Sequence, residues 1–156
     1  MPVIRIEIDD EGTQAFFQSL RQNTRDTTEL MTAVGGVMVK SISDQFLSEG
    51  RRYQGQPWAP LKESTLNRRR MKGRDAYILR DTGNLFGSID IQEQTHTYVD
   101  VGTDVVYGAT HQFGDALRNI PARPFLPETL IPEDDESITR LTDMWLQQKI
   151  DESEMG

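Results

Sequence analysis

The densest group of side chains able to bind a charged ligand is a short basic run. It consists of Arg68, Arg69, Arg70, Lys72 and Arg74. Cations this close together can neutralise neighbouring phosphates of a nucleic acid and release its counterions. They can also dock on an acidic protein surface or form the solvated face of a helix. Protein docking, phosphate contact within an assembly and free DNA binding are therefore all open interpretations.

Aromatic side chains surround this run in the sequence. Tyr53, Trp58 and Tyr77 are able to stack on bases. Trp58 lies between Pro57 and Pro60, which predicts an extended loop around it. A tryptophan held in such a loop is either a core residue or an interface anchor, and the sequence leaves both open.

No catalytic constellation accompanies these residues. Asp81-Thr82-Gly83 matches the tripeptide of aspartic proteases, in which two such loops share one proton. The chain carries one such loop, and Arg80 stands where an apolar residue is expected. We interpret Asp81 as a helix cap. There is no Gly-x-Ser-x-Gly elbow, P-loop or Gly-x-Gly-x-x-Gly motif, so we expect no enzymatic activity.

Metal and cofactor sites have equally little support. The chain has no cysteine and two histidines, His96 and His111, far apart in sequence. A metal site gathers several ligands at defined spacing, which these residues do not provide. We expect His96 in a hairpin turn and His111 as a hydrogen-bonded structural residue, with no cofactor.

The first half of the chain must position the basic run. Alternating residues predict a short strand over 3–8, and apolar residues at helical spacing follow over 15–20. A stronger apolar stripe predicts a helix from about 26 to 48. Gly35-Gly36 lies inside it and indicates close packing or a kink. The basic run itself falls in a predicted helix over 64–71.

The second half alternates between strands and loops. Residues 85–91 and 97–102 alternate and predict an antiparallel hairpin. A short helix is expected over 105–113. Four prolines then argue against regular structure until about 134, where an amphipathic helix begins. The predicted fold class is α+β, with a long helix packed on a small, mostly antiparallel sheet, long irregular loops and a C-terminal helix. Residues 1–150 form one expected domain, and 151–156 a frayed acidic tail.

Charge is segregated along the chain. The 17 basic and 25 acidic side chains give a net charge of −8, which argues against general binding to nucleic acids. Residues 51–80 carry nine basic and two acidic groups, whereas 128–156 carry two basic and nine acidic groups. Two faces of opposite sign suit a head-to-tail ring subunit. No apolar run approaches the roughly 20 residues that span a bilayer, and nothing at the N-terminus resembles a signal peptide, so we expect no membrane association.

Several segments in fixed order give a resemblance to a known family. They read GQPWAPL (55–61), STL (64–66), ILRDTGNL (78–85), SI (88–89), VGT (101–103), VYGATHQFG (106–114) and IPARPFL (120–126). Each piece is short, but their order and spacing over about residues 30–150 resemble the phage virion morphogenesis family, the Mu-like G proteins and related tail completion proteins. The segment 115–119 is a short insertion in this pattern, with no role assigned to it.

The resemblance implies a non-enzymatic structural role in tailed-phage or prophage assembly, at tail completion or the head–tail neck, as an oligomeric ring. Implied partners are further copies of the chain, a tail tube, terminator or head–tail connector protein, and packaged DNA in the channel. The implied location is the virion, assembled in the bacterial cytoplasm. The alternative is a DNA-binding accessory factor using residues 68–74.

The residues expected at a partner or assembly interface combine the basic run with aromatic and arginine anchors. The proline-rich stretch 121–126 predicts an extended arm, which either reaches a partner or folds back on its own core. The expected interface residues are Trp58, Arg68, Arg69, Arg70, Lys72, Arg74, Arg123 and Phe125.

Overall fold

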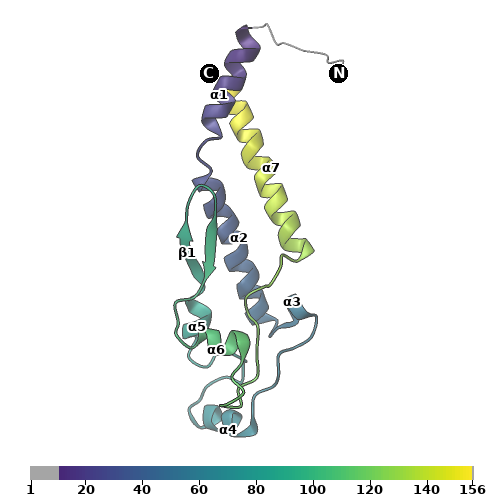
Figure 1. Ribbon diagram of the computed structural model, residues 1–156. Coiled ribbons are helices and arrows are strands. Elements are labelled where there is room, and N and C mark those ends of the chain that lie inside the picture. Colours follow the sequence, from purple (N-terminus) through teal and green to yellow (C-terminus); the bar gives the residue numbers. More distant parts are fainter. Residues whose placement is uncertain (1–10, 156) are drawn as a thin grey trace, which may run out of the picture.

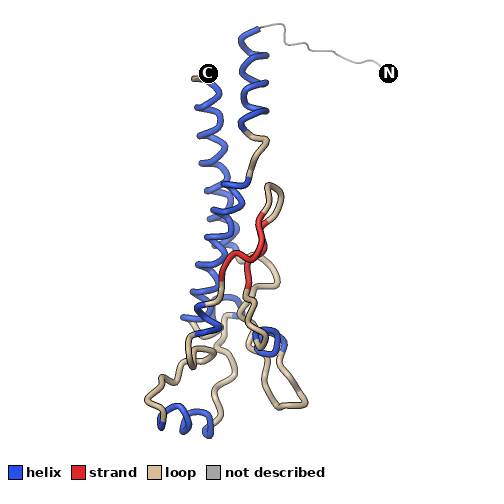
Figure 2. The backbone as a smooth tube through the Cα atoms, turned by 90° about the vertical axis from the view of Figure 1, so that its left-hand side faces the viewer, coloured by secondary structure: helices blue, strands red, loops and turns tan. Residues whose placement is uncertain are grey.

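Three helices run along the length of the molecule and determine its elongated shape (Figure 1). In a computed structural model that describes residues 11–155, α1 (Glu11–Asn23) and α2 (Thr28–Leu47) are followed by the short helix α3 (Arg51–Gln54). The C-terminal helix α7 (Pro132–Glu154) returns beside α2 and then α1. The turned view shows the same elongated arrangement, with the short helices at one end (Figure 2).

A two-stranded antiparallel hairpin packs against α2. Its strands are β1 (Asp90–Gln94) and β2 (Val99–Gly102). The register shifts between Ile91 and Glu93, which is a β-bulge. The hairpin turn contains His96, as expected, and its carbonyl accepts a hydrogen bond from the Thr27 hydroxyl at the start of α2. The predicted α+β class, with a long helix on a small antiparallel sheet, is confirmed.

The remaining helices are short and lie at the far end from the C-terminus. They are α4 (Glu63–Met71), α5 (Asn84–Gly87) and α6 (Gly108–Phe113). Loop 55–62 joins α3 to α4, loop 72–83 joins α4 to α5, and loop 114–131 joins α6 to α7. The buried core of the molecule lies between α2 and these segments. Its members are Ile42, Phe46, Trp58, Ile78, Leu79, Leu85, Ile89 and Phe125.

Three local expectations differ from the structure. Residues 84–87 form α5, so the predicted strand over 85–91 begins only at Asp90; Gly83, in a left-handed conformation (φ 80°), starts a helical turn instead. The C-terminal helix, expected from about 134, already begins at Pro132, because the first position of a helix does not need the N–H that proline lacks.

The expected frayed tail is wrong for 151–154, because α7 continues through them. Ser153 is buried and accepts a hydrogen bond from Asn23 in α1. The predicted strand over 3–8 lies outside the described residues.

Gly35 allows the hairpin to approach α2. A Cβ atom at this position would stand 2.6 Å from Ile91 Cδ1 and 2.9 Å from Val99 Cγ2, both on the hairpin. At Gly36, nothing lies within 4 Å of the same atom. The expected close packing is therefore a property of the first glycine alone.

This difference makes the glycine pair a matched test. We expect Gly35→Ala to lower the free energy of unfolding by about 1–3 kcal/mol, because the added methyl group forces the hairpin off the helix. We expect Gly36→Ala to raise it by up to about 1 kcal/mol, because alanine is the better helix former. Urea unfolding of both variants checks the prediction, and equal effects of the two substitutions would contradict it.

Candidate functional site

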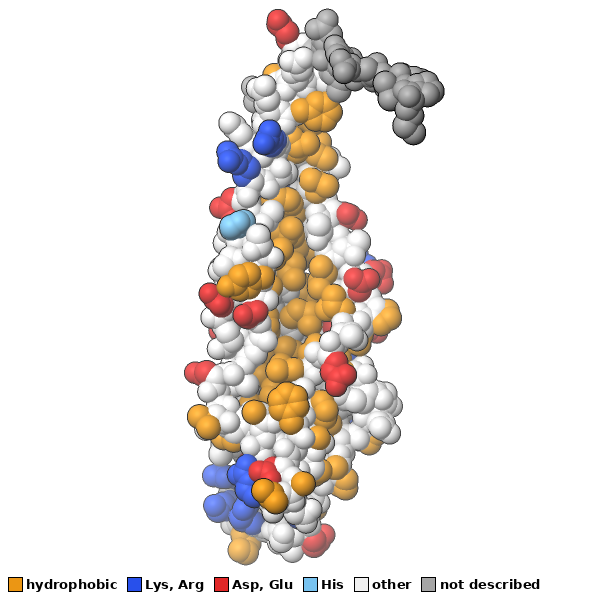
Figure 3. Space-filling model, viewed as in Figure 1, with side chains coloured by type: hydrophobic (Ala, Val, Ile, Leu, Met, Phe, Trp, Pro, Cys, Tyr) orange, Lys and Arg blue, Asp and Glu red, His pale blue; other side chains and the backbone are white. Residues whose placement is uncertain are grey.

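The basic run lies on and just after α4, at the end of the molecule opposite the C-terminus. Figure 3 shows blue side chains gathered at this end and hydrophobic side chains in a band along the length of the visible face. Arg68, Arg69 and Arg70 occupy the last turn of α4, where positive charge is favoured by the helix dipole. Arg68, Arg70, Lys72 and Arg74 are exposed. These four side chains are available to a partner.

Arg69 differs from its neighbours because it is 6% exposed. Its Nη1 atom donates hydrogen bonds to the carbonyl oxygens of Asp75 at 3.2 Å and Tyr77 at 2.5 Å. Its Nε atom lies 3.5 Å from Asp81 Oδ1. Arg69 therefore holds the 75–81 segment against α4.

Asp81 is a partner of basic residues and not the expected helix cap. Its Oδ1 atom lies 3.2 Å from Arg74 Nη1 as well as 3.5 Å from Arg69 Nε. Gly83 occupies the N-cap position of α5, and Thr82 Oγ1 accepts a bond from the Asn84 backbone N–H at 3.4 Å. An aspartate between two guanidinium groups is held as a counter-ion.

Three further predicted interface residues also lie inside the molecule. Trp58 and Phe125 are 5% and 1% exposed, and both rings contact Phe46. Arg123, 6% exposed, donates from Nε to Ala59 O at 2.9 Å and from Nη2 to Pro60 O at 3.0 Å. The proline-rich arm thus folds back onto its own core.

Burial therefore corrects the predicted interface. Trp58, Arg69, Arg123 and Phe125 are buried within the monomer, and the two arginines reach a surface only in the wall of a pocket. For the exposed members of the set, a role in binding a partner stays a prediction.

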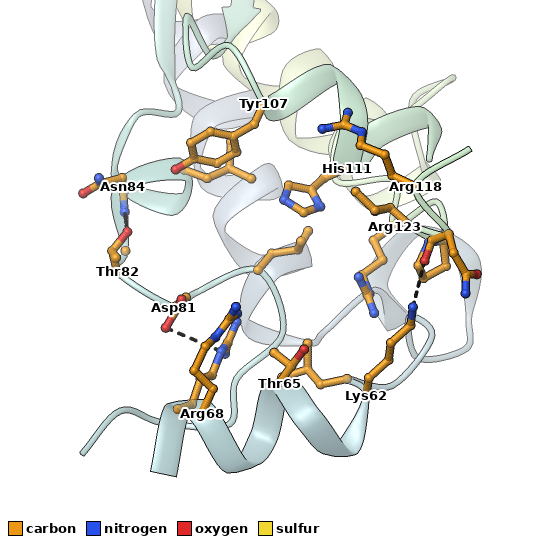
Figure 4. A pocket seen from close by; sticks show the side chains of 18 residues that line it. Lys62, Thr65, Arg68, Asp81, Thr82, Asn84, Tyr107, His111, Arg118 and Arg123 are labelled. Atoms are coloured by element: carbon orange, nitrogen blue, oxygen red, sulfur yellow. Dashed lines mark hydrogen bonds and ion pairs between the residues drawn. The ribbon is translucent and has the colours of Figure 1, made fainter. Parts of the chain in front are cut away.

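A pocket of about 570 Å³ opens between α4, α5, α6 and the 114–124 loop (Figure 4). His111 projects toward its centre, with Arg123 beside it and Arg68 and Asp81 on the opposite wall. Five basic side chains and one carboxylate line it, so its charge is strongly positive. The charged and titratable lining residues are Lys62, Arg68, Arg69, Asp81, Tyr107, His111, Arg118 and Arg123.

The side chain of His111 lies in the wall of the pocket and is half-buried. Burial and the neighbouring Arg123 charge lower the pKa of its imidazole, because both disfavour a second positive charge. Its Nδ1 atom is buried without a hydrogen-bond partner, and the ring of Tyr107 packs edge-on against it with centroids 5.9 Å apart. Among residues 11–155, the expected side-chain hydrogen bond of His111 is thus not formed at Nδ1. The backbone N–H of His111 donates to Tyr107 O and its carbonyl accepts from the Arg123 N–H.

This lowered pKa predicts a pH dependence of stability. In the unfolded chain the pKa of histidine is near 6.5, so below that pH the unfolded state takes up a proton more readily than the folded state does. The free energy of unfolding should fall as the pH decreases from about 7 toward 5, and His111→Gln should remove part of that fall. Urea unfolding at pH 7.5 and 5.5 measures it. His96→Gln, at an exposed turn, is the control, and equal slopes for His111→Gln and the parent would contradict the prediction.

Sequence analysis missed Lys62 and Arg118 as members of this site. Lys62 Nζ donates to Asn119 O at 3.1 Å, and Arg118 Nε donates to Asp115 Oδ2 at 2.6 Å. The i, i+3 spacing of Asp115 and Arg118 in the inserted segment was a signal for a local ion pair. Nothing local indicated that this segment meets α4.

Among residues 11–155, no three or more His, Asp or Glu side chains are grouped to hold a metal ion. No helix in that range combines the length and apolar character needed to cross a membrane.

The amino-acid sequence is similar to one family of known proteins and to two individual proteins. The model of the phage virion morphogenesis family matches residues 8–147. The Mu-like prophage FluMu G protein 2 of Haemophilus influenzae is 34% identical over 143 residues, covering 87% of this chain and 91% of that protein. An uncharacterized protein of Methanocaldococcus jannaschii is 29% identical over 105 residues, covering 65% of this chain and 77% of its own. No solved structure matches significantly.

The family match covers nearly the whole described chain and agrees with the motif order found in the sequence. It supports a role in phage assembly, among other phage structural proteins. On this evidence, the chain belongs to the phage virion morphogenesis family.

Proposed function

We propose that the protein completes the tail or joins head and tail at the neck, as an oligomeric ring of identical subunits. The family places it in phage assembly, and its similarity to a Mu-like prophage G protein agrees with a structural, non-enzymatic component of the virion. Its partners are then further copies of itself and a tail tube, terminator or head–tail connector protein.

The main support for an oligomeric ring is the large solvent-exposed surface area of the single chain. The chain exposes 10974 Å², whereas a compact monomer of this size exposes roughly 8000 Å². Residues 1–10 and 156 would contribute roughly 1800 Å² even as fully unfolded chain, so they do not account for the difference. Surface of this extent is typical of a subunit that is covered by neighbours.

Exposed apolar side chains support the same proposal. Val106, Phe113 and Leu117 are 95%, 80% and 101% exposed and belong to α6 or its flanking loops. Met144 is 69% exposed on α7. Large apolar groups presented to water in this number favour contact with another protein.

A second function has one specific observation in its favour. The exposed cations at the end of α4 form a compact cluster, which suits contact with phosphates, either of packaged DNA in a channel or of free DNA. Free binding predicts an affinity for duplex DNA that falls steeply between 50 and 200 mM salt, with a shallower slope after alanine replaces these residues. The rest of the chain is negatively charged and opposes it.

Deletion of the gene from its phage or prophage tests the proposed function. Electron microscopy of lysates should show separate heads and tails, or tails of abnormal length, and few infectious particles. Purified protein added to the lysate should restore joined particles. Normal infectious particles without the protein would overturn the proposal.

A further inference from the structure

The basic pocket carries more positive charge than its own carboxylate can balance. Arg69 and Arg123 are both buried and both line it, together with Lys62, Arg68 and Arg118. Asp81 is the one acidic side chain among its lining residues in the described chain. Buried charges in proteins are normally paired, so a site of this kind favours an anionic ligand.

Arg123 shows the imbalance most clearly. Its side chain donates hydrogen bonds to Ala59 O and Pro60 O, which are neutral carbonyl groups. Burial lowers the pKa of its guanidinium, and the nearby charge of Arg69 lowers it further. A carboxylate entering the pocket would relieve the repulsion between these two groups.

Two other groups in the pocket are ready to bind a ligand. The side chain of Arg68 lies at the rim and makes no ion pair or hydrogen bond within the described residues. His111 Nδ1 is buried and has no hydrogen-bond partner in the described part of the chain. Lys62 and Arg118 are already engaged with Asn119 and Asp115, so a ligand would meet the side chain of Arg68 first.

The shape of the pocket favours a protein side chain over a nucleic acid. Leu61, Leu79, Leu85 and Ile120 supply apolar lining, and the cavity is about 570 Å³. A concave site of this size accepts one or two side chains, whereas duplex DNA needs an open track of cations along its backbone.

The chain carries a matching acidic surface on α7. Asp135, Glu136 and Asp143 are exposed around a shallow hollow, where Arg140 is the one basic residue among the lining residues. This surface and the pocket share no lining residue and lie on different parts of the molecule. Two different complementary surfaces join copies of a chain head to tail. Each dimer then still has one free pocket and one free acidic surface, to which further copies can add.

We propose that the basic pocket binds the acidic surface of α7, formed by Asp135, Glu136 and Asp143, of a second copy of this chain. The contact rests on the proposed function, since it supplies the subunit interface of the ring. It also assigns a role to the opposite charges of segments 51–80 and 128–156.

Charge-reversed full-length variants test the contact. Arg68→Glu changes the pocket, and Asp135→Arg with Glu136→Arg changes the α7 surface. Arg51→Glu is the control for the first, because Arg51 is exposed, belongs to the same basic segment and does not line the pocket. Glu128→Arg is the control for the second. Circular dichroism and thermal melting verify that each variant is folded.

Sedimentation velocity over a wide concentration range, at 50 and 300 mM salt, measures self-association. We expect the parent and both controls to form oligomers that weaken with salt, and each test variant to associate at least tenfold more weakly. Mixing the two test variants should then give a 1:1 dimer that grows no further, because one intact pocket meets one intact acidic surface.

Unchanged association of Arg68→Glu, a mixture without dimers, or a parent protein that stays monomeric would each overturn this contact. Those results leave the proposed function to be decided by the deletion experiment, so the two failures are distinguishable. Loss of association in Arg51→Glu as strong as that in Arg68→Glu would show a general charge effect and would also overturn the contact.

Discussion

Replacing Trp58 with alanine is expected to lower the free energy of unfolding by about 3–5 kcal/mol. The indole is 5% exposed and packs edge-on against Phe46, with ring centroids 5.7 Å apart. Its Nε1–H donates to Pro124 O at 2.9 Å, which ties the 55–61 loop to the proline-rich arm. The substitution therefore leaves a large cavity in the core and removes one of the hydrogen bonds that Pro124 O accepts, while the bond from Gln45 Nε2 at 3.0 Å remains.

Urea unfolding followed by far-ultraviolet circular dichroism measures this effect. Trp58→Phe retains most of the packing and loses the donor, so it should cost about 1–3 kcal/mol and lie between the parent and the alanine variant. Trp145→Phe, in the partly exposed face of α7, is the control and should change little. A loss below about 1 kcal/mol for Trp58→Ala would contradict the placement of this ring in the core.

Asp134→Asn is expected to cost about 2–3 kcal/mol, because its carboxylate joins three helices. Asp134 is 3% exposed in the first turn of α7. Its Oδ1 lies 2.7 Å from Arg52 Nη2 in α3, and its Oδ2 accepts a bond from Ser41 Oγ in α2 at 2.5 Å. Removing the charge leaves the largely buried Arg52 with the exposed Glu133 as its remaining acidic partner.

Thermal and urea unfolding test this network. Asp135→Asn is a matched control, since it removes the same charge one residue further along, on the exposed side of the helix. It should change the free energy of unfolding by less than about 0.5 kcal/mol. Equal effects of the two substitutions would show that the contribution comes from the helix dipole and not from the buried network.

The elements that sequence periodicity predicted well are those with long local patterns. The apolar stripe over 26–48 corresponds to α2 (Thr28–Leu47), and the stripe after residue 134 belongs to α7. The segment 85–91 was too short for its alternation to decide between strand and helix, and local turn chemistry at Gly83 made a helical turn. Short patterns fail because tertiary contacts outweigh weak propensities.

The basic run shows why the site was only partly predictable. Successive helical residues point about 100° apart, so three consecutive arginines cannot share one environment. Arg69 is therefore buried while Arg68 and Arg70 are exposed, but the sequence alone does not say which one turns inward. The pocket joins segments more than fifty residues apart, from Leu61 to Arg123, and contacts of that range leave no local signal.

The number of copies of this protein in purified phage particles tests the central claim most directly. Quantitative mass spectrometry against isotope-labelled peptides from the chain, normalised to the major head protein, gives that number. The proposed ring predicts a fixed number of several copies per particle, present in complete particles. Absence of the protein from complete particles, or a single copy per particle, would contradict a structural ring at the tail end or neck.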